Sequence, residues 1–325
     1  MISLSRIKFI FFILIGIFIF FWVYEFFAGP ESLSLITENS DRLYFLILAH
    51  IPTLYFDSLS WYILVGKKSF SIKLAFLITW IAQAAGKFFP TGNITGEFVR
   101  GYLGVKKGLS TSNASTTVFA DLIIATFALF IISFFSFLLI LFKDSNFFSI
   151  HNSLYFYISL AVFFLTCILI FVLIRKRALK YLINEISRIF KVSLKKKIVL
   201  TLLKIDFQLF KLSQNKIKLF KAFSFRIIGW ICGAFEIYVF LWVIGIDASL
   251  TDVVILESLT SLIKAFAFFI PGGLGVQELA FVMIGNFLGF SASISFSIAI
   301  GRRIREIFVG LPAVLAWYSI FYKKL

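Results

Sequence analysis

The chain has 325 residues, of which 60% are hydrophobic and only 15% are charged, with 32 Lys and Arg against 16 Asp and Glu. Soluble domains are about 45–50% apolar and about a quarter charged, so this composition excludes a water-soluble globule. The two Cys and two His are too few for a zinc site, and we expect no metal and no cofactor. The net charge of +16 accompanies lipid-like segments, which argues against nucleic acid as a partner.

The N-terminal part of the chain predicts two membrane spans, at 7–28 and 42–65. Basic residues precede the first span, which is too long for a signal-peptide core, so we expect it to remain uncleaved with the N-terminus in the cytoplasm. Acidic residues without Lys or Arg follow it, as expected on the outer side.

The next segment, 72–104, has basic residues at both ends, which predicts that it enters and leaves the membrane on the cytoplasmic side. Pro90 and Gly92 break the helix within it, because proline and glycine stop a helix. We therefore predict a re-entrant helical hairpin at 72–104. A closing span at 112–142 completes a first membrane repeat, 1–142.

A second membrane repeat is predicted over 143–325. Its expected elements are a span at 154–174, a basic cytoplasmic insert at 175–224, a span at 225–246, a re-entrant hairpin at 254–290 and a final span at 293–322.

The insert carries fourteen Lys or Arg and two acidic residues between Arg175 and Lys221. Apolar residues recur at helical spacing over 179–189 and again over 198–212, which indicates two amphipathic helices. Two interpretations remain open: contact with the anionic inner leaflet, or a solvated connector without lipid specificity.

Two stretches 181 positions apart share a pattern. Pro90–Glu97 and Pro271–Glu278 both have Pro first, Gly two residues later and Glu seven residues later, and the same offset relates the flanking spans. The number of crossings between the two copies is odd, which predicts inverted repeats. Such repeats with paired broken helices build substrate sites in transporters; the alternative is a duplication retained for folding alone.

Charged residues inside the predicted membrane segments are the candidate binding residues, because each costs about 2.5–3.5 kcal/mol at the bilayer centre. The final span carries four of them close together, and the planar fork of arginine suits a phosphate group. The predicted substrate-binding residues are Lys87, Glu97, Arg100, Lys264, Glu278, Arg302 and Arg303.

Structural alternatives exist for these residues. Arg302 can pair with Glu306 at i,i+4, Glu257 can pair with Lys264, and the two motif glutamates can stabilise the first turns of helices. Asp57 and Glu236 lie near the centres of two spans, where each could bind a proton or an amino headgroup. We expect each of them to pair with an arginine instead.

The two motifs, Lys87-Phe-Phe-Pro90 to Leu103 and Pro271-Gly-Gly-Leu-Gly-Val-Gln-Glu278, resemble the signature stretches of the flippase-like membrane family related to the transmembrane region of lysylphosphatidylglycerol synthases. The resemblance extends over nearly the whole chain. It implies a translocator of aminoacylated phosphatidylglycerol in the synthases themselves, with a separate soluble domain for lysyl transfer. The structural motif positions are Pro90, Gly92, Gly96, Pro271, Gly272, Gly273 and Gly275.

We therefore expect an all-α polytopic protein of the cytoplasmic membrane, with both termini cytoplasmic. The expected function is transport of a lipid with an anionic, aminoacylated or lipid-linked phosphate headgroup. The chain ends directly after its last predicted span, so we expect no soluble catalytic domain and a transporter rather than an enzyme. Two alternatives remain: a membrane transferase with Glu97, Asp57 or Glu278 as general base, and a non-catalytic partner of a separate lipid transferase.

Overall fold

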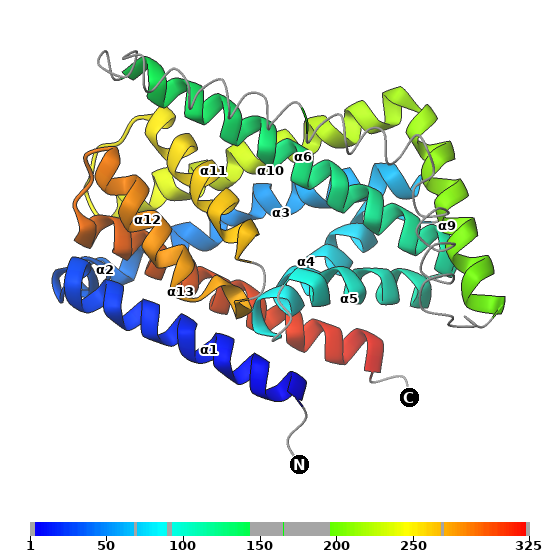
Figure 1. Cartoon of the computed structure of the whole chain (residues 1–325), viewed down its shortest axis with the longest axis horizontal. Coiled ribbons are helices and arrows are strands. Elements are labelled where there is room, and N and C mark those ends of the chain that lie inside the picture. The colour runs from blue at the N-terminus through cyan, green and yellow to red at the C-terminus, as the bar shows by residue number, and fades with distance from the viewer. Residues whose placement is uncertain are drawn as a thin grey trace.

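The computed structural model describes residues 4–67, 70–89, 93–143, 165, 196–267 and 270–322. These residues form helices and no strand (Figure 1). The α-helices are α1 (Leu4–Val23), α2 (Glu31–Glu38), α3 (Tyr44–Val65), α4 (Ile72–Phe88), α5 (Asn93–Lys106), α6 (Thr111–Lys143), α9 (Lys196–Gln214), α10 (Lys216–Val243), α11 (Leu250–Phe266), α12 (Val276–Phe287) and α13 (Ala292–Trp317). Short helical turns are η1 (Tyr24–Ala28), η2 (Ser40–Arg42), η4 (Pro271–Gly273) and η5 (Tyr318–Tyr322).

Five helical segments within the described residues are long and apolar enough to cross a membrane. They are Phe11–Ala28, Ser40–Val65, Thr111–Ile140, Lys216–Val243 and Ala292–Phe321. The chain is therefore an all-helical, multi-pass membrane protein, as the composition predicts. Five predicted spans each fall largely within one of these segments, whereas the predicted span at 154–174 lies outside the described residues, apart from Leu165.

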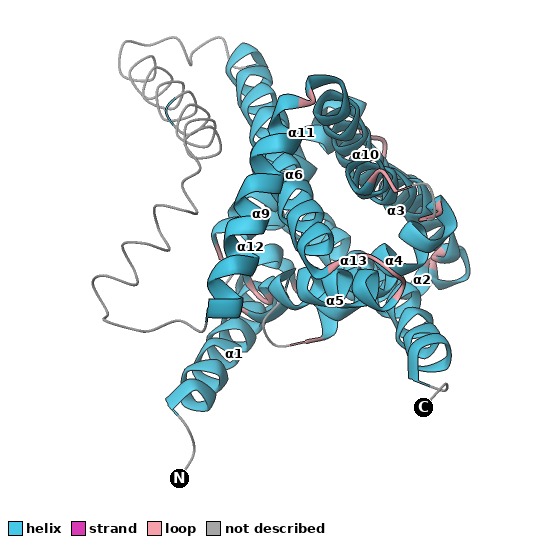
Figure 2. Cartoon of the chain, turned by 90° about the vertical axis from the view of Figure 1, so that its right-hand side faces the viewer, coloured by secondary structure: helices cyan, strands magenta, loops and turns pink. Residues whose placement is uncertain are grey.

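The five candidate spans follow the long axis of the molecule in Figure 1. The pair α4–α5 occupies the right-hand half of that view and the pair α11–α12 the left-hand half. The helix α4 contacts η4, which lies between α11 and α12 in the sequence. Figure 2 looks along this axis and shows α1 at the edge of the bundle and α3 beside α10, two helices that are in extensive contact.

Small residues let α4 and α5 approach closely. A Cβ added to Gly96 on α5 would lie 2.6 Å from the carbonyl oxygen of Ala82 and 3.3 Å from the Cα of Gly86, both on α4. Close packing of small residues is a principal source of helix association in membranes. The motif position Gly96 therefore fixes the distance between the two helices.

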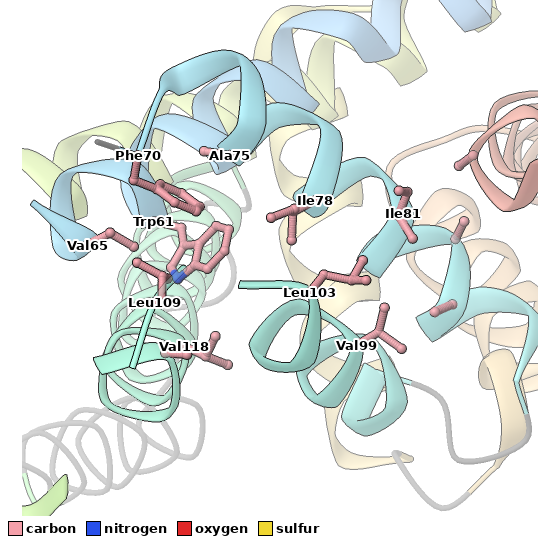
Figure 3. Packing of buried hydrophobic residues seen from close by; sticks show 14 residues of the cluster. Trp61, Val65, Phe70, Ala75, Ile78, Ile81, Val99, Leu103, Leu109 and Val118 are labelled. Atoms are coloured by element: carbon pink, nitrogen blue, oxygen red, sulfur yellow. The ribbon is translucent and has the colours of Figure 1, made fainter. Parts of the chain in front are cut away.

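The pair α4–α5 is anchored to α3 and α6 by a buried apolar cluster (Figure 3). The ring of Trp61 on α3 is fully buried and meets Phe70 edge to face, with the ring centroids 5.3 Å apart. Leu103 from α5 and Val118 from α6 complete the same cluster. Trp61 also donates a hydrogen bond to Thr117 on α6, at 3.2 Å, so the indole N–H is satisfied.

The turns that precede α6 and α13 have the same hydrogen bonds. The N–H of Leu109 donates to Gly104 at 3.0 Å, and the N–H of Phe290 donates to Gly285 at 2.9 Å. Each turn has a glycine with positive φ, 93° at Gly108 and 91° at Gly289, a conformation that residues with a Cβ rarely adopt. Two distant parts of the chain thus make the same turn.

The basic insert is described from Lys196 onward. The predicted apolar periodicity over 198–212 lies within α9, whereas 179–189 lies outside the described residues. The helix α10 begins at Lys216, capped by the side chain of Asn215, which accepts a hydrogen bond from the N–H of Lys218 at 3.0 Å. The predicted start of the span at residue 225 therefore lies inside α10, one helix that extends back into the basic insert.

Candidate functional site

Four charged residues lie in the middle of α13, and each has a partner on a neighbouring element. Arg302 pairs with Glu257 on α11, and Arg303 pairs with Glu278 on α12 at 3.0 Å. The guanidinium of Arg305 lies 3.0 Å from Glu236 on α10. Glu306 accepts a hydrogen bond from Lys87 on α4 at 2.6 Å. Pairing of this kind lowers the cost of charge at membrane depth.

We use the name tip cluster for the polar residues at the facing ends of the two helix pairs together with the α13 residues that bind them. Its centre is Arg303, which donates from Nε to the Glu278 carboxylate and from Nη1 to the carbonyl oxygen of Gly272 at 2.8 Å. Glu306 lies 3.6 Å from the same Nη1. The tip cluster comprises Lys87, Lys264, Gln277, Glu278, Arg303 and Glu306.

The two helix pairs meet through these contacts. Lys87 comes from the end of α4, and Gly272 comes from η4 between α11 and α12. Both reach α13, and a Cβ added to Gly272 would lie 3.5 Å from Arg303 Nη1 and 3.8 Å from the carbonyl oxygen of Lys87. Segments far apart in the sequence therefore form one polar site.

Two buried donors of the tip cluster are unsatisfied. Neither Nη2 of Arg303 nor Nε2 of Gln277 has a hydrogen-bond partner among the described residues. Gln277 is 1% exposed, and its carbonyl oxygen already accepts from the ammonium of Lys264. An unsatisfied buried donor costs about 1–3 kcal/mol, so these two N–H groups mark a place where an acceptor such as a phosphate oxygen would bind favourably.

The glycines of the second motif allow this arrangement. Gly272, Gly273 and Gly275 have φ of 61°, 62° and 77°. A Cβ added to Gly275 would lie 2.5 Å from the carbonyl oxygen of Gly16 on α1, and one added to Gly273 would lie 3.0 Å from the side chain of Lys264. The turn therefore requires glycine both for its backbone angles and for close approach.

A second group, which we call the Asp121 cluster, lies between α3, α5, α6 and α10. Asp121 is fully buried and receives Arg100 at 2.7 Å, Arg226 and the hydroxyl of Ser60. Arg226 also binds Asp57 at 2.6 Å. The remaining contacts are Glu97 with Arg100 at 3.3 Å and Gln83 with Asp57 at 2.9 Å.

Arg226 is the residue that sequence reasoning missed. It lies one residue inside the predicted span 225–246, and it bridges two acidic residues on different helices. The presence of Asp57 and Asp121 in apolar segments is the signal that could have indicated a missing basic partner, since buried carboxylates need one. The expectation that Asp57 pairs with an arginine is confirmed.

A third group surrounds Glu236. His50 Nδ1 lies 2.8 Å from one carboxylate oxygen, to which Thr53 donates at 2.7 Å, and Arg305 binds the other oxygen. The expected pairing of Glu236 with an arginine is thus confirmed. Nearby, Arg302 binds Glu257 and lies over the ring of Phe281, 5.4 Å from its centroid.

The structure divides the seven predicted binding residues among three places. Lys87, Lys264, Glu278 and Arg303 come together in the tip cluster. Glu97 and Arg100 lie in the Asp121 cluster, and Arg302 faces Glu257. Two motif positions, Pro90 and Gly92, lie outside the described residues.

The structural alternatives for these residues have mixed outcomes. Arg302 pairs with Glu257 rather than with Glu306 at i,i+4, because Glu306 faces α4 and is bound by Lys87. The pairing of Glu257 with Lys264 is not found either, since the Lys264 ammonium donates to Gln277. Glu278 does cap its helix, accepting from the N–H of Gly275 at 2.7 Å, and it binds Arg303 at the same time.

No group of three or more His, Cys, Asp or Glu side chains that could hold a metal ion is found within the described residues. The polar sites are instead formed by alternating basic and acidic side chains with backbone carbonyls. Such a set recognises charged groups by ion pairing.

An all-helical bundle with five candidate spans and buried ion-pair clusters at mid-length defines a multi-pass membrane protein with a polar interior. Residues 9–313 match the family model described as the lysylphosphatidylglycerol synthase TM region. The chain therefore belongs to the family of the transmembrane region of lysylphosphatidylglycerol synthases, as its two motifs indicate. No significant match is found among curated proteins or among solved structures.

Proposed function

We propose that the protein is a lipid translocator of the cytoplasmic membrane that moves an anionic, aminoacylated or lipid-linked phosphate headgroup between the leaflets. The observation that carries the proposal is the tip cluster, in which Arg303 and Gln277 have unsatisfied buried donors beside the ammonium groups of Lys87 and Lys264. A headgroup phosphate supplies the missing acceptors. The family adds support, because its name links it to lipid handling.

The proposal includes an inverted repeat with two re-entrant hairpins, α4–α5 and α11–α12. Its support is the shared offset of 181 residues, which carries the turn at Gly108 onto that at Gly289 with the same hydrogen bonds. The two hairpins point toward each other along the axis of the spans (Figure 1). Broken helices that meet at the membrane midplane are a common way to build a transporter site.

The proposed orientation places both termini in the cytoplasm. The support is charge. Arg6 and Lys8 precede the first span, and Lys67 donates to the carbonyl oxygen of Gly108, next to Lys106 and Lys107, so these three lysines lie at the same end of the bundle. In this orientation the hairpin α4–α5 opens to the cytoplasm and α11–α12 opens to the outside. Alternating exposure of the tip cluster then needs movement of one hairpin at a time.

Four of the predicted residues, Lys87, Lys264, Glu278 and Arg303, form the proposed headgroup site. The proposed roles are phosphate binding for the three basic residues and orientation of Arg303 for Glu278. Glu97, Arg100 and Arg302 stay predictions as binding residues. A general-base role for Asp57 or Glu278 is disfavoured, because each carboxylate is bound to an arginine guanidinium.

Reconstitution into vesicles tests the proposal. A fluorescent phosphatidylglycerol in the inner leaflet becomes accessible to a membrane-impermeant quencher only when it is translocated, so the rate of signal loss reports flipping. We expect the double variant Arg303→Gln with Lys264→Gln to slow translocation at least tenfold, since two charge-assisted contacts to phosphate are lost. Exposed lysines away from the tip cluster provide the control, Lys73→Gln with Lys106→Gln. Equal rates for the two double variants and the wild type would contradict the site.

A further inference from the structure

A second polar site lies at the end of the bundle where α3 finishes and α10 begins. It is a groove with a volume of about 430 Å³, within the range of small-molecule sites. The polar and glycine residues that line it are Tyr62, Gly66, Lys67, Asn215, Lys218 and Lys221. None of the residues lining it is acidic, so the groove has a surplus of three positive charges.

The three lysines are not neutralised within the described residues, where none of them forms an ion pair with a carboxylate. Lys67 donates to the carbonyl oxygen of Gly108 at 2.6 Å, and Lys218 donates to that of Leu64 at 2.7 Å. Each ammonium has three donors, so each keeps two for a ligand. The carbonyl contacts hold these two lysines in fixed positions while leaving their charge available.

Gly66 makes the position of Lys218 possible. A Cβ added to Gly66 would lie 2.6 Å from the Lys218 ammonium nitrogen, closer than real Cβ atoms come. Gly66 also has a φ of 58°, which ends α3 in a left-handed turn. The glycine therefore allows the end of α3 and the lysine on α10 to meet across the groove.

Apolar side chains border the same groove. Ile217 lines it and is 72% exposed, and Phe220 one turn further along α10 is 69% exposed. Both belong to the candidate span Lys216–Val243. Large exposed apolar residues next to lysines at the end of a span match the boundary between acyl chains and headgroups.

The geometry points to a binding site for an anionic phospholipid in this groove, with the phosphate held by Lys67, Lys218 and Lys221 and the acyl chains lying against Ile217 and Phe220. This site is separate from the tip cluster, and it does not rest on the proposed function. It holds a headgroup at the membrane surface, whether or not the protein translocates lipid.

Native mass spectrometry of the full chain in detergent tests the site. The probes are a short-chain phosphatidylglycerol, the matching phosphatidylcholine and water-soluble glycerol 3-phosphate. We expect phosphatidylglycerol to bind more tightly than the other two. Lys218→Gln with Lys221→Gln should weaken its binding about 30-fold, from the contribution of two surface lysines, whereas Lys73→Gln with Lys106→Gln should change it about twofold or less.

A pair of glycine variants tests the geometry without changing charge. Gly66→Ala displaces Lys218 and should weaken phosphatidylglycerol binding about fivefold, the effect of one lysine. Gly29→Ala is the matched control, because Gly29 has a similar φ of 63° but no atom within 4 Å of an added Cβ. Backbone strain from alanine is at least as large in the control, because ψ is −177° at Gly29 and 21° in the left-handed turn at Gly66, and only Gly66→Ala reaches the groove.

Four results would overturn the inference. Equal loss of binding in the two lysine pairs would reduce the effect to overall charge. Tight binding of glycerol 3-phosphate would assign the groove to a soluble phosphate compound. Equal affinity for phosphatidylcholine would remove the role of the anionic charge, and equal effects of Gly66→Ala and Gly29→Ala would exclude a positioned lysine.

Discussion

The helix pairs α4–α5 and α11–α12 each contact the long helix that follows them, α6 and α13, but the side chains that meet there differ. In the first, Arg100 forms an ion pair with Asp121 on α6. The residues 181 positions further on, Phe281 and Arg302, also contact each other, but there an arginine lies over an aromatic ring. The same pair of positions therefore holds an ion pair in one part of the chain and a cation–π contact in the other.

The difference extends to the charged group at the centre of each cluster. In the Asp121 cluster the central carboxylate binds two arginines and a hydroxyl, and these contacts connect α6 to α5, α10 and α3. In the tip cluster the central group is Arg303. Both clusters have unsatisfied buried atoms, which are Nε of Arg100 and Oε2 of Glu97 in the first and Nη2 of Arg303 and Nε2 of Gln277 in the second. The central charge is thus negative in the Asp121 cluster and positive in the tip cluster. Four comparisons between variants probe the two regions.

The largest effect is expected for Asp121→Ala. The change leaves Arg100 and Arg226 buried with reduced neutralisation, and breaking a buried pair in this way costs about 3–5 kcal/mol. Unfolding in mixed detergent micelles measures the loss of free energy. Asp247→Ala, at an exposed position after α10, is the control and should stay within about 0.5 kcal/mol. Similar stability of the two variants would show that the Asp121 cluster contributes little to the free energy of unfolding.

The two motif glutamates provide the next comparison. Glu278→Gln should cost about 1.5–3 kcal/mol, because a fully buried carboxylate loses charge-assisted bonds to Arg303 and to the N–H of Gly275. Glu97→Gln should cost about 1 kcal/mol or less, since Glu97 is partly exposed and Arg100 keeps Asp121. The same unfolding assay separates them, and equal losses would show that the two halves are alike at these positions.

A smaller difference is expected at the matching turns. A Cβ added to Gly285 would lie 2.1 Å from the Ser295 hydroxyl and 2.9 Å from its Cβ, so Gly285→Ala should cost about 1–3 kcal/mol by overpacking. At Gly104 the nearest atom is a methyl group of Leu109 at 3.1 Å, which can shift. Gly104→Ala should therefore be the milder variant in thermal unfolding, and the reverse order would mean that the first turn is the tighter one.

The smallest effect concerns the arginine–aromatic contact. A double-mutant cycle of Arg302→Gln and Phe281→Leu should give a coupling of about 0.5–2 kcal/mol, the value of a cation–π contact that is largely desolvated. The cycle removes the packing loss of Phe281 from the result. A coupling near zero would leave the ion pair with Glu257 as the main role of Arg302.

Periodicity and helix-breaking residues predicted most of the helical framework. Apolar runs located the five candidate spans, and the offset of 181 residues related turns that prove to have the same hydrogen bonds. These features are local, because a span or a turn is determined by its own residues. The choice of Lys87, Lys264, Glu278 and Arg303 as functional candidates followed from the cost of charge in apolar segments.

The pairing of the charges was less predictable. Arg302 has an acidic residue at i,i+4 and nevertheless binds Glu257 on another helix. Arg226 joins Asp57 to Asp121, and neither partner is near it in the sequence. The ion-pair partner of a side chain depends on the rotation of its helix about the helix axis and on its position along that axis. A nearly uniform apolar sequence contains little information on the rotation or the position.

The pairing pattern of α13 has a consequence for how the protein enters the membrane. Four charged residues at mid-membrane cost about 10–14 kcal/mol in total for an isolated helix on the insertion scale, so α13 is a poor candidate for independent insertion. The partners of these residues lie on α4, α10, α11 and α12, all of which precede α13 in the chain. These four helices are synthesised before α13. We therefore expect α13 to enter the membrane by packing against helices that already supply the opposite charges.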